Sequence, residues 1–294
     1  MSNPLSEVFG FPITNESSQA KRYREKRLCP YHNVVPSCTK TRADDPLGVC
    51  SVYHRNEPII TCPVRFREDW LIVDAAADFF FESGVKWTSL GEVRLKNKQG
   101  GPIGNIDYVL VAYDDVGRVL DFGSLEVQAV YISGNLGGPF KTYMEQPRPD
   151  FDWSGALNYP TPDYLSSSRK RLAPQLVAKG GVMRLWGKKQ AVAIQTAFYN
   201  TLPPLPEVDR SQADLAWYLY DLVYNSGDQR MHLQLNRIVY TEYESALLSL
   251  SNNEPADVES FVAVLQRKLD SKFAGNIDST TPFLGDTDGS PATE

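Results

Sequence analysis

Two neighbouring stretches, 105-NIDYVLVAYDD-115 and 118-RVLDFGSLEVQAVYISG-134, decide the fold of this chain. Both are rich in the β-branched and aromatic residues that favour strands, and Gly117 supplies the turn between them. A third strand-like segment, residues 89–97, precedes them and is separated from them by the Gly-rich turn of residues 98–104. The sequence therefore predicts three consecutive strands.

Helical and strand-like segments flank these three strands. Residues 69–84 form an apolar helical run, and residues 162–181 predict a second helix that is kinked by Pro174. Residues 188–202 have the apolar and β-branched content of a buried strand. This order of elements predicts an α/β fold in which helices flank a mixed β-sheet core.

The composition changes along the chain and predicts four parts. The first is rich in Pro, Cys, His and Asn without a sustained period, so we expect a module that is ordered by something other than an apolar core. The C-terminal third contains two segments with the spacing of amphipathic helices, residues 211–224 and 258–269. The expected parts are an N-terminal module (1–68), the core (69–205), a C-terminal helical part of the same core (206–275) and a disordered acidic tail (276–294).

Charge is unevenly distributed in this chain, whose net charge is −6. Residues 21–67 carry ten Lys or Arg against four acids, and residues 141–190 carry nine against four. Residues 205–294 carry fifteen acids against six bases. The overall acidity argues against a uniformly basic nucleic-acid binder, but the two basic segments are candidates for phosphate contacts. No apolar stretch predicts a membrane helix or a signal peptide, so we expect a cytoplasmic protein with no membrane partner.

Acidic residues interrupt two of the apolar strands at positions where they should converge. Asp107 lies in the first of these strands, and Glu126 and Gln128 project from one face of the next because they are two residues apart. A carboxylate in an apolar strand is unfavourable unless it is paired or binds a cation. Asp107 and Glu126 therefore predict a Mg²⁺ site suited to phosphodiester hydrolysis, and Glu92 could bind a second metal ion or orient the site. The alternative is that these acids form salt bridges or lie at a sheet edge.

The four cysteines, Cys29, Cys38, Cys50 and Cys62, all lie within 34 residues of each other. A cytoplasmic setting disfavours disulfides, so four thiols in a loop-rich segment suggest one tetrahedral structural metal site. The intervening lengths of eight, eleven and eleven residues differ from the short spacing of zinc ribbons, and His32 or His54 could replace one thiol. Zinc and iron both suit such a site, and buried free thiols or two disulfides are the alternatives.

The acidic set resembles the PD-(D/E)xK nuclease superfamily, with Gln128 where that pattern has Lys. This ExQ variant, with Glu92 upstream and a four-cysteine segment before the core, is similar to the NotI-like family of type II restriction endonucleases over most of residues 29–200. The resemblance implies a PD-(D/E)xK restriction-endonuclease-like core with an N-terminal four-cysteine metal-binding module that holds one structural iron. It implies catalytic roles for Glu92, Asp107, Glu126 and Gln128, with two Mg²⁺ ions. Because an amide cannot supply a positive charge, Gln128 could only orient the attacking water.

Basic residues in two segments are candidates for contacts with phosphates or guanine edges, the alternative being solvated surface charges. They are Arg22, Arg24, Lys26, Arg27, Lys40, Arg42, Lys141, Arg169, Lys170 and Arg171.

The resemblance implies a homodimeric enzyme that cuts both strands of DNA at a short GC-rich palindrome and leaves 5′-phosphate and 3′-hydroxyl ends. Self-protection would require a cognate DNA methyltransferase in the same organism. Two other functions fit the same residues. One is a metal-stabilised DNA-binding regulator whose acids are structural, and the other is a repair or structure-specific nuclease on the same core.

Overall fold

The computed structural model describes residues 3–32, 36–42, 44–153, 158–252 and 257–273. The chain forms two compact units, residues 1–251 and 252–294. Within these described residues, no helix combines the length and the apolar character needed to cross a membrane.

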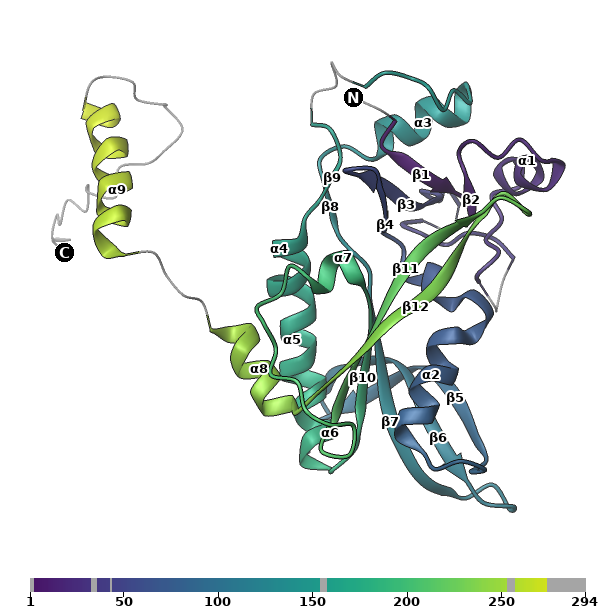
Figure 1. The fold of residues 1–294 in the computed structure, drawn as a ribbon, viewed down its shortest axis with the longest axis vertical. Coiled ribbons are helices and arrows are strands. Elements are labelled where there is room, and N and C mark those ends of the chain that lie inside the picture. The colour runs from purple at the N-terminus through teal and green to yellow at the C-terminus, as the bar shows by residue number, and fades with distance from the viewer. Residues whose placement is uncertain (1–2, 33–35, 43, 154–157, 253–256, 274–294) are drawn as a thin grey trace, which may run out of the picture. The chain divides into compact units, whose positions relative to one another are not determined.

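A six-stranded mixed sheet forms the centre of the first unit (Figure 1). The strand order is β12-β11-β10-β7-β6-β5, in which β5, β6 and β7 are antiparallel neighbours. Parallel pairing joins β7 to β10 and β10 to β11, and the edge strand β12 runs antiparallel to β11. The three consecutive strands and the mixed sheet predicted from sequence are therefore confirmed. The bounds are β5 (Trp87–Lys96), β6 (Pro102–Tyr113), β7 (Val119–Gln128), β10 (Gln190–Gln195), β11 (Leu215–Asn225) and β12 (Arg230–Thr241).

Both faces of the central strands are buried, and alternate residues of β10 show how. Ala191 and Ala193 belong to the apolar cluster that contains helix α2 (Leu71–Phe80). Val192 and Ile194 point the other way, into a cluster with residues from the 164–185 helical segment and α8 (Tyr243–Ser251). The period of two is that of a strand, and the small alanines give α2 room to approach the sheet.

The prediction of an amphipathic helix at residues 211–224 is wrong, because this segment forms β11 and pairs with β12 in a long hairpin. Leu215, Trp217 and Leu219 pack on one face, and Ala216, Tyr218 and Tyr220 pack on the other. A strand that is buried on both faces has a continuous apolar run instead of an alternating one. The expected C-terminal helical part of the core is therefore largely a β-hairpin.

The N-terminal segment contains its own sheet, contrary to the expectation that it has no apolar core. Its strand order is β2-β1-β3-β4. Leu5, Val8 and Val52 are completely buried and belong to the same cluster as Val192 of the central sheet. Packing joins residues 1–68 to the main core, and the short strands explain why no period was visible. The bounds are β1 (Leu5–Val8), β2 (Phe11–Pro12), β3 (Val49–His54) and β4 (Glu57–Ile60).

The helix predicted at residues 162–181 is confirmed, and it is irregular on both sides of Pro174. Two π-type stretches flank the short helix that contains this proline, which lacks the N–H needed for a regular α-helical bond. The segment consists of α4 (Tyr164–Ser167), η2 (Ser168–Leu172), α5 (Ala173–Gln175), η3 (Leu176–Gly180) and α6 (Gly181–Leu185).

The remaining elements are short, apart from the helix of the second unit. That helix, α9, covers the predicted helical segment 258–269, which is confirmed. The predicted tail at 276–294 lies outside the described residues. The bounds are α1 (Ser18–Glu25), η1 (Pro63–Trp70), β8 (Ile132–Ser133), α3 (Gly137–Glu145), β9 (Thr161–Pro162), α7 (Thr196–Tyr199) and α9 (Val258–Phe273).

Candidate active site

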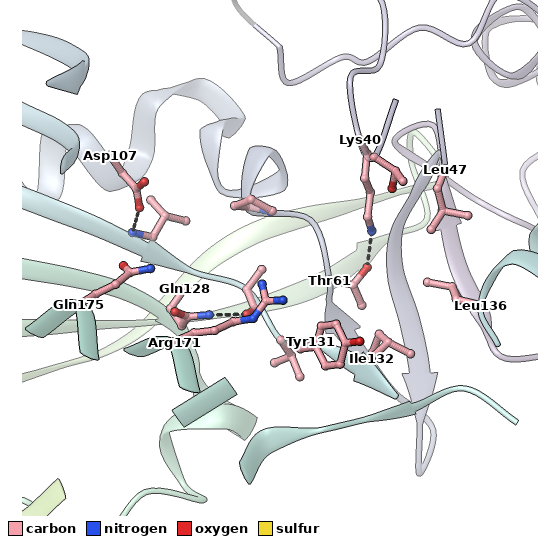
Figure 2. Close-up of a pocket in the computed structure, with 15 residues that line it drawn as sticks. Lys40, Leu47, Thr61, Asp107, Gln128, Tyr131, Ile132, Leu136, Arg171 and Gln175 are labelled. Carbon is pink, nitrogen blue, oxygen red and sulfur yellow. Dashed lines mark hydrogen bonds between the residues drawn. The ribbon is translucent and has the colours of Figure 1, made fainter. Parts of the chain in front are cut away.

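Asp107 lies on β6, where its carboxylate points toward the neighbouring strand. Its Oδ2 accepts a hydrogen bond of 2.8 Å from the backbone N–H of Val127 on β7 (Figure 2). This bond fixes the carboxylate beside Glu126, the residue before Val127. The structure therefore brings Asp107 and Glu126 together from adjacent strands, as the sequence predicts.

Glu126 is almost completely buried on β7, with 7% of its surface exposed. Its Oε2 accepts a hydrogen bond of 2.5 Å from Nζ of Lys179, whereas none of the described residues donates a hydrogen bond to its buried Oε1. Burial raises the pKa of Glu126 to about 8, and the neighbouring Asp107 carboxylate adds to the increase, which Lys179 partly offsets. Two adjacent carboxylates, one with an orphaned oxygen, form an acceptor set that a cation would satisfy.

Gln128 ends β7 and, like Glu126, is buried. Its Nε2 donates a hydrogen bond of 2.7 Å to the carbonyl of Ala129. The amide nitrogen is therefore engaged by the chain itself, and Oε1 is the atom of this side chain that is suited to orient a water molecule.

Glu92 lies on β5 and is exposed to solvent. Its neighbours Gly91 and Val93 pair with Tyr108 and Ile106, which places Glu92 opposite Asp107. Its φ of 54° lies in the left-handed region, which is unusual for a non-glycine residue and strains the backbone within the strand. The strand register therefore places Glu92, on the edge strand β5, next to Asp107 on β6.

Lys179 is a site residue that the sequence reasoning missed. Its side chain is 9% exposed, and its Nζ contacts Glu126 from the helical segment. A signal was present, because Leu172, Leu176 and Met183 are buried at helical spacing and Lys179 falls on the same face. A lysine at an apolar position of an amphipathic helix requires a buried partner.

A pocket of about 530 Å³ opens beside these residues. Asp107, Gln128 and Gln175 line one end of it, and Lys40, Thr61 and hydrophobic residues line the other (Figure 2). The pocket therefore runs from Asp107 to the cysteine-containing segment.

Two of the candidate DNA contacts line this pocket. The Arg171 guanidinium stacks over the Tyr131 ring at 4.8 Å from its centroid. Nζ of Lys40 donates to the carbonyl of Val49 at 2.5 Å and to Oγ1 of Thr61 at 2.9 Å.

Arg24 does not fit its predicted role as a DNA contact. It is 6% exposed, and its two terminal nitrogens donate to the carbonyls of Asn15 and Pro12 at 2.8 and 2.6 Å. The guanidinium is held inside the protein and stabilises the N-terminal loops.

The other predicted DNA contacts are exposed side chains, and two of them form ion pairs. Arg27 pairs with Asp45, and Lys141 pairs with Glu145 at 3.8 Å. These exposed residues are Arg22, Lys26, Arg27, Arg42, Lys141, Arg169 and Lys170.

The four cysteines lie in one neighbourhood as free thiols. Burial raises the pKa of the Cys29, Cys38 and Cys50 thiols, and in each case the nearby Cys62 adds to the increase. For Cys29 the pKa rises to about 11. Cys62 is therefore the common neighbour of the other three thiols.

No metal-binding arrangement confirms the predicted four-cysteine module. Over the described part of the chain, no group of three or more His, Cys, Asp or Glu side chains is arranged to hold a metal ion. The shared neighbourhood of the thiols is the feature that remains compatible with a structural metal.

The chain matches a known protein family. The family model described as restriction endonuclease NotI matches residues 7–233, which is more than half of the chain and includes both the cysteine segment and the carboxylate site. No curated protein matches the chain.

Proposed function

This chain belongs to the NotI restriction endonuclease family, and we propose that it uses Mg²⁺ to cut both strands of DNA at a short GC-rich palindrome. Family membership implies a nuclease that acts on DNA. The observation that carries the finer proposal is the buried pair of Asp107 and Glu126, with its unsatisfied oxygen. The core would then be of the PD-(D/E)xK type.

The carboxylate pair fits a magnesium ion in its chemistry. Oxygen ligands are those that Mg²⁺ prefers, and Oε1 of Glu126 accepts no hydrogen bond from the residues that the structure describes. We propose that Asp107 and Glu126 hold the metal, with Glu92 opposite Asp107 as the ligand or orienting group of a second ion. When bound, Mg²⁺ would supply Lewis-acid chemistry by neutralising charge on the phosphate and making water more acidic.

The residues of the chain hold and orient the reacting groups in this proposal. The Val127 N–H fixes Asp107, and the ammonium of Lys179 fixes Glu126, so neither carboxylate has to reorganise when DNA binds. Oε1 of Gln128 would accept a hydrogen bond from the attacking water and so orient that water. Nε2 of Gln128 would stay hydrogen-bonded to the carbonyl of Ala129. The products would be a 5′-phosphate and a 3′-hydroxyl.

We propose that DNA follows the pocket from Asp107 toward the cysteine-containing segment. Arg171 and Lys40 line that path and would contact phosphates. The exposed basic residues of the N-terminal segment 1–68 would extend this surface, in support of a DNA-contacting role for that segment. A palindromic site would be cut most simply by a homodimer, and a cognate methyltransferase would protect the host's own copies.

Cleavage in the presence of Mg²⁺ is the first test of this function. We expect purified protein to convert plasmid and phage DNA into discrete fragments with Mg²⁺ and to leave the same DNA intact with EDTA. A DNA-binding regulator would retard the DNA without cutting it. Intact DNA across a wide panel of substrates would therefore contradict the proposal.

We also propose that Cys29, Cys38, Cys50 and Cys62 hold one structural iron or zinc. Four thiols around Cys62 support this, because deprotonation of neighbouring buried thiols needs a compensating cation.

Elemental analysis of untagged protein should find about one iron or zinc per chain, as four thiolates bind one tetrahedral ion. We expect Cys62→Ser to lose the metal, whereas Ser37→Ala, an exposed change in the same segment, should retain it. Folded wild-type protein with neither metal would refute the assignment.

A further inference from the structure

Lys179 makes more polar contacts than a single ion pair requires. Its Nζ donates to Oε2 of Glu126 at 2.5 Å, to the carbonyl of Asn105 at 2.8 Å and to Oε1 of Gln175 at 3.3 Å. An ammonium has three donors, so all three are used. The position of the charge is therefore fully specified by groups on three different elements.

These contacts tie together the two strands that bear the carboxylates. Asn105 precedes Asp107 by two residues on β6, and Glu126 lies on β7. The aliphatic stem of Lys179 passes over Gly104, where an added Cβ would lie 3.4 Å from Cδ of the lysine. The lysine stem therefore packs closely against Gly104 of β6 on its way to the site.

The helical segment is built to turn this lysine inward. Lys179 belongs to the π-type stretch η3, and Gln175, one of its acceptors, ends the helix that contains Pro174. Departures from α-helical geometry of this kind are frequent at functional sites. A buried lysine is costly at a core position, so its presence beside the orphaned Oε1 of Glu126 requires an explanation.

A buried carboxylate usually has hydrogen-bond partners for both of its oxygens. Here Lys179 donates to Oε2, and no described residue donates a hydrogen bond to Oε1. The site also lacks a positive charge at residue 128, where an amide stands on the same strand face as Glu126. Among the described hydrogen bonds and ion pairs, Lys179 is the basic residue that contacts the pair of Asp107 and Glu126, and it does so through Glu126.

We propose that Lys179 is a positioning residue of the nuclease site: it fixes Glu126 for metal binding and supplies, from the helical segment, the positive charge that Gln128 cannot supply. This inference rests on the proposed function. The inference places the positive charge of the site on a residue that lies 51 residues after Gln128 in the sequence.

The test compares four proteins: the wild type, Lys179→Met, Lys188→Met and the double variant Gln128→Lys/Lys179→Met. Lys188 is a matched control because it pairs at 2.6 Å with Asp121, an acid that lies on β7 like Glu126 but outside the site. Single-turnover cleavage in Mg²⁺, DNA affinity in Ca²⁺ and the melting temperature with and without Mg²⁺ are measured for each.

We expect Lys179→Met to slow cleavage by roughly a hundredfold, as loss of one preorganised charge does in other sites. DNA affinity should stay within about threefold, because the Lys179 side chain is buried and its ammonium donates to groups of the protein itself. Added Mg²⁺ should raise the melting temperature of Lys179→Met less than that of the wild type, because Glu126 is no longer fixed for metal binding. Lys188→Met should match the wild type in all three measurements.

The double variant returns a lysine to the strand face of Glu126, and we expect it to recover part of the cleavage rate. It also carries the test if Lys179→Met fails to fold, because it restores a partner for the buried carboxylate. Cleavage by Lys179→Met at the wild-type rate would overturn the inference, as would a folded, DNA-binding double variant that does not cut. If the wild type itself cuts no DNA, the proposed function fails instead.

Discussion

Asp107→Asn should abolish Mg²⁺-dependent cleavage and leave DNA binding unchanged. Asparagine has the same shape, and its side-chain oxygen can still accept the hydrogen bond from the Val127 N–H. The variant therefore removes one negative charge from the pair with Glu126 and little else. Loss of a single preorganised electrostatic group costs roughly 10²–10³ in rate, and a metal ligand should cost at least that much.

Single-turnover cleavage in Mg²⁺ and DNA affinity in Ca²⁺ separate the two effects. Asp121→Asn is the matched control, because Asp121 lies on β7 and pairs with Lys188 away from the carboxylate pair. We expect this control to cut at the wild-type rate. Cleavage by Asp107→Asn within a few-fold of the wild type would show that Asp107 is a structural acid.

Arg65→Met should lower the free energy of unfolding by about 3–5 kcal/mol, the usual cost of removing one partner from a buried ion pair. The Arg65 side chain is completely buried, as is that of Glu7. It donates to Glu7 at 3.1 Å and to Glu68 at 2.7 Å, and its remaining nitrogen donates to the carbonyl of Met231 at 2.8 Å. Removal of the guanidinium leaves two buried carboxylates that repel each other.

The loss of stability caused by Arg65→Met should depend on pH. Burial opposes ionisation of Glu68, but the Arg65 guanidinium, together with hydrogen bonds from the Leu233 N–H and His232, lowers the pKa of Glu68 below its ordinary value. A lowered folded-state pKa stabilises the protein above the unfolded-state pKa, and this contribution is lost as pH falls through the folded-state value. The difference between variant and wild type should therefore be larger at pH 7 than in acid.

Urea unfolding at both pH values measures this effect. Arg237→Met is the control, since Arg237 and Glu207 form an exposed pair at 2.6 Å, and such pairs contribute at most about 1 kcal/mol. A loss for Arg65→Met no larger than that of the control would contradict the role of this network in joining the N-terminal sheet to β12.

The sequence predicts the part of the fold in which apolar residues recur with a single period, either that of a strand or that of a helix. The three strands around Asp107 and Glu126 alternate or turn at glycines, and α2 has a helical period, so both were predictable. The β11 segment was not, because burial on both faces around Trp217 removes the alternation that identifies a strand. The N-terminal strands were missed because they are short and their register depends on distant partners.

The site residues were predictable to different degrees for the same physical reasons. Asp107 and Glu126 stand out as acids within apolar strands, where only a pair or a cation satisfies them. Lys179 is a single basic residue on a helix, and its partner is 53 residues away in the sequence. Arg24 is the opposite case, a residue that was predicted for the site but lies outside it. It belongs to a cluster of basic residues in the sequence, and that cluster does not reveal that its side chain is buried against loop carbonyls.

Sequencing the ends of digested genomic DNA, with Glu126→Gln treated in parallel, shows whether the carboxylate pair drives sequence-specific cleavage. We expect wild-type protein with Mg²⁺ to leave ends that share one short two-fold symmetric sequence, and Glu126→Gln to leave none. Ends without a common sequence would point to a repair or structure-specific nuclease. The same ends from Glu126→Gln would show that the chemistry does not depend on the carboxylate pair.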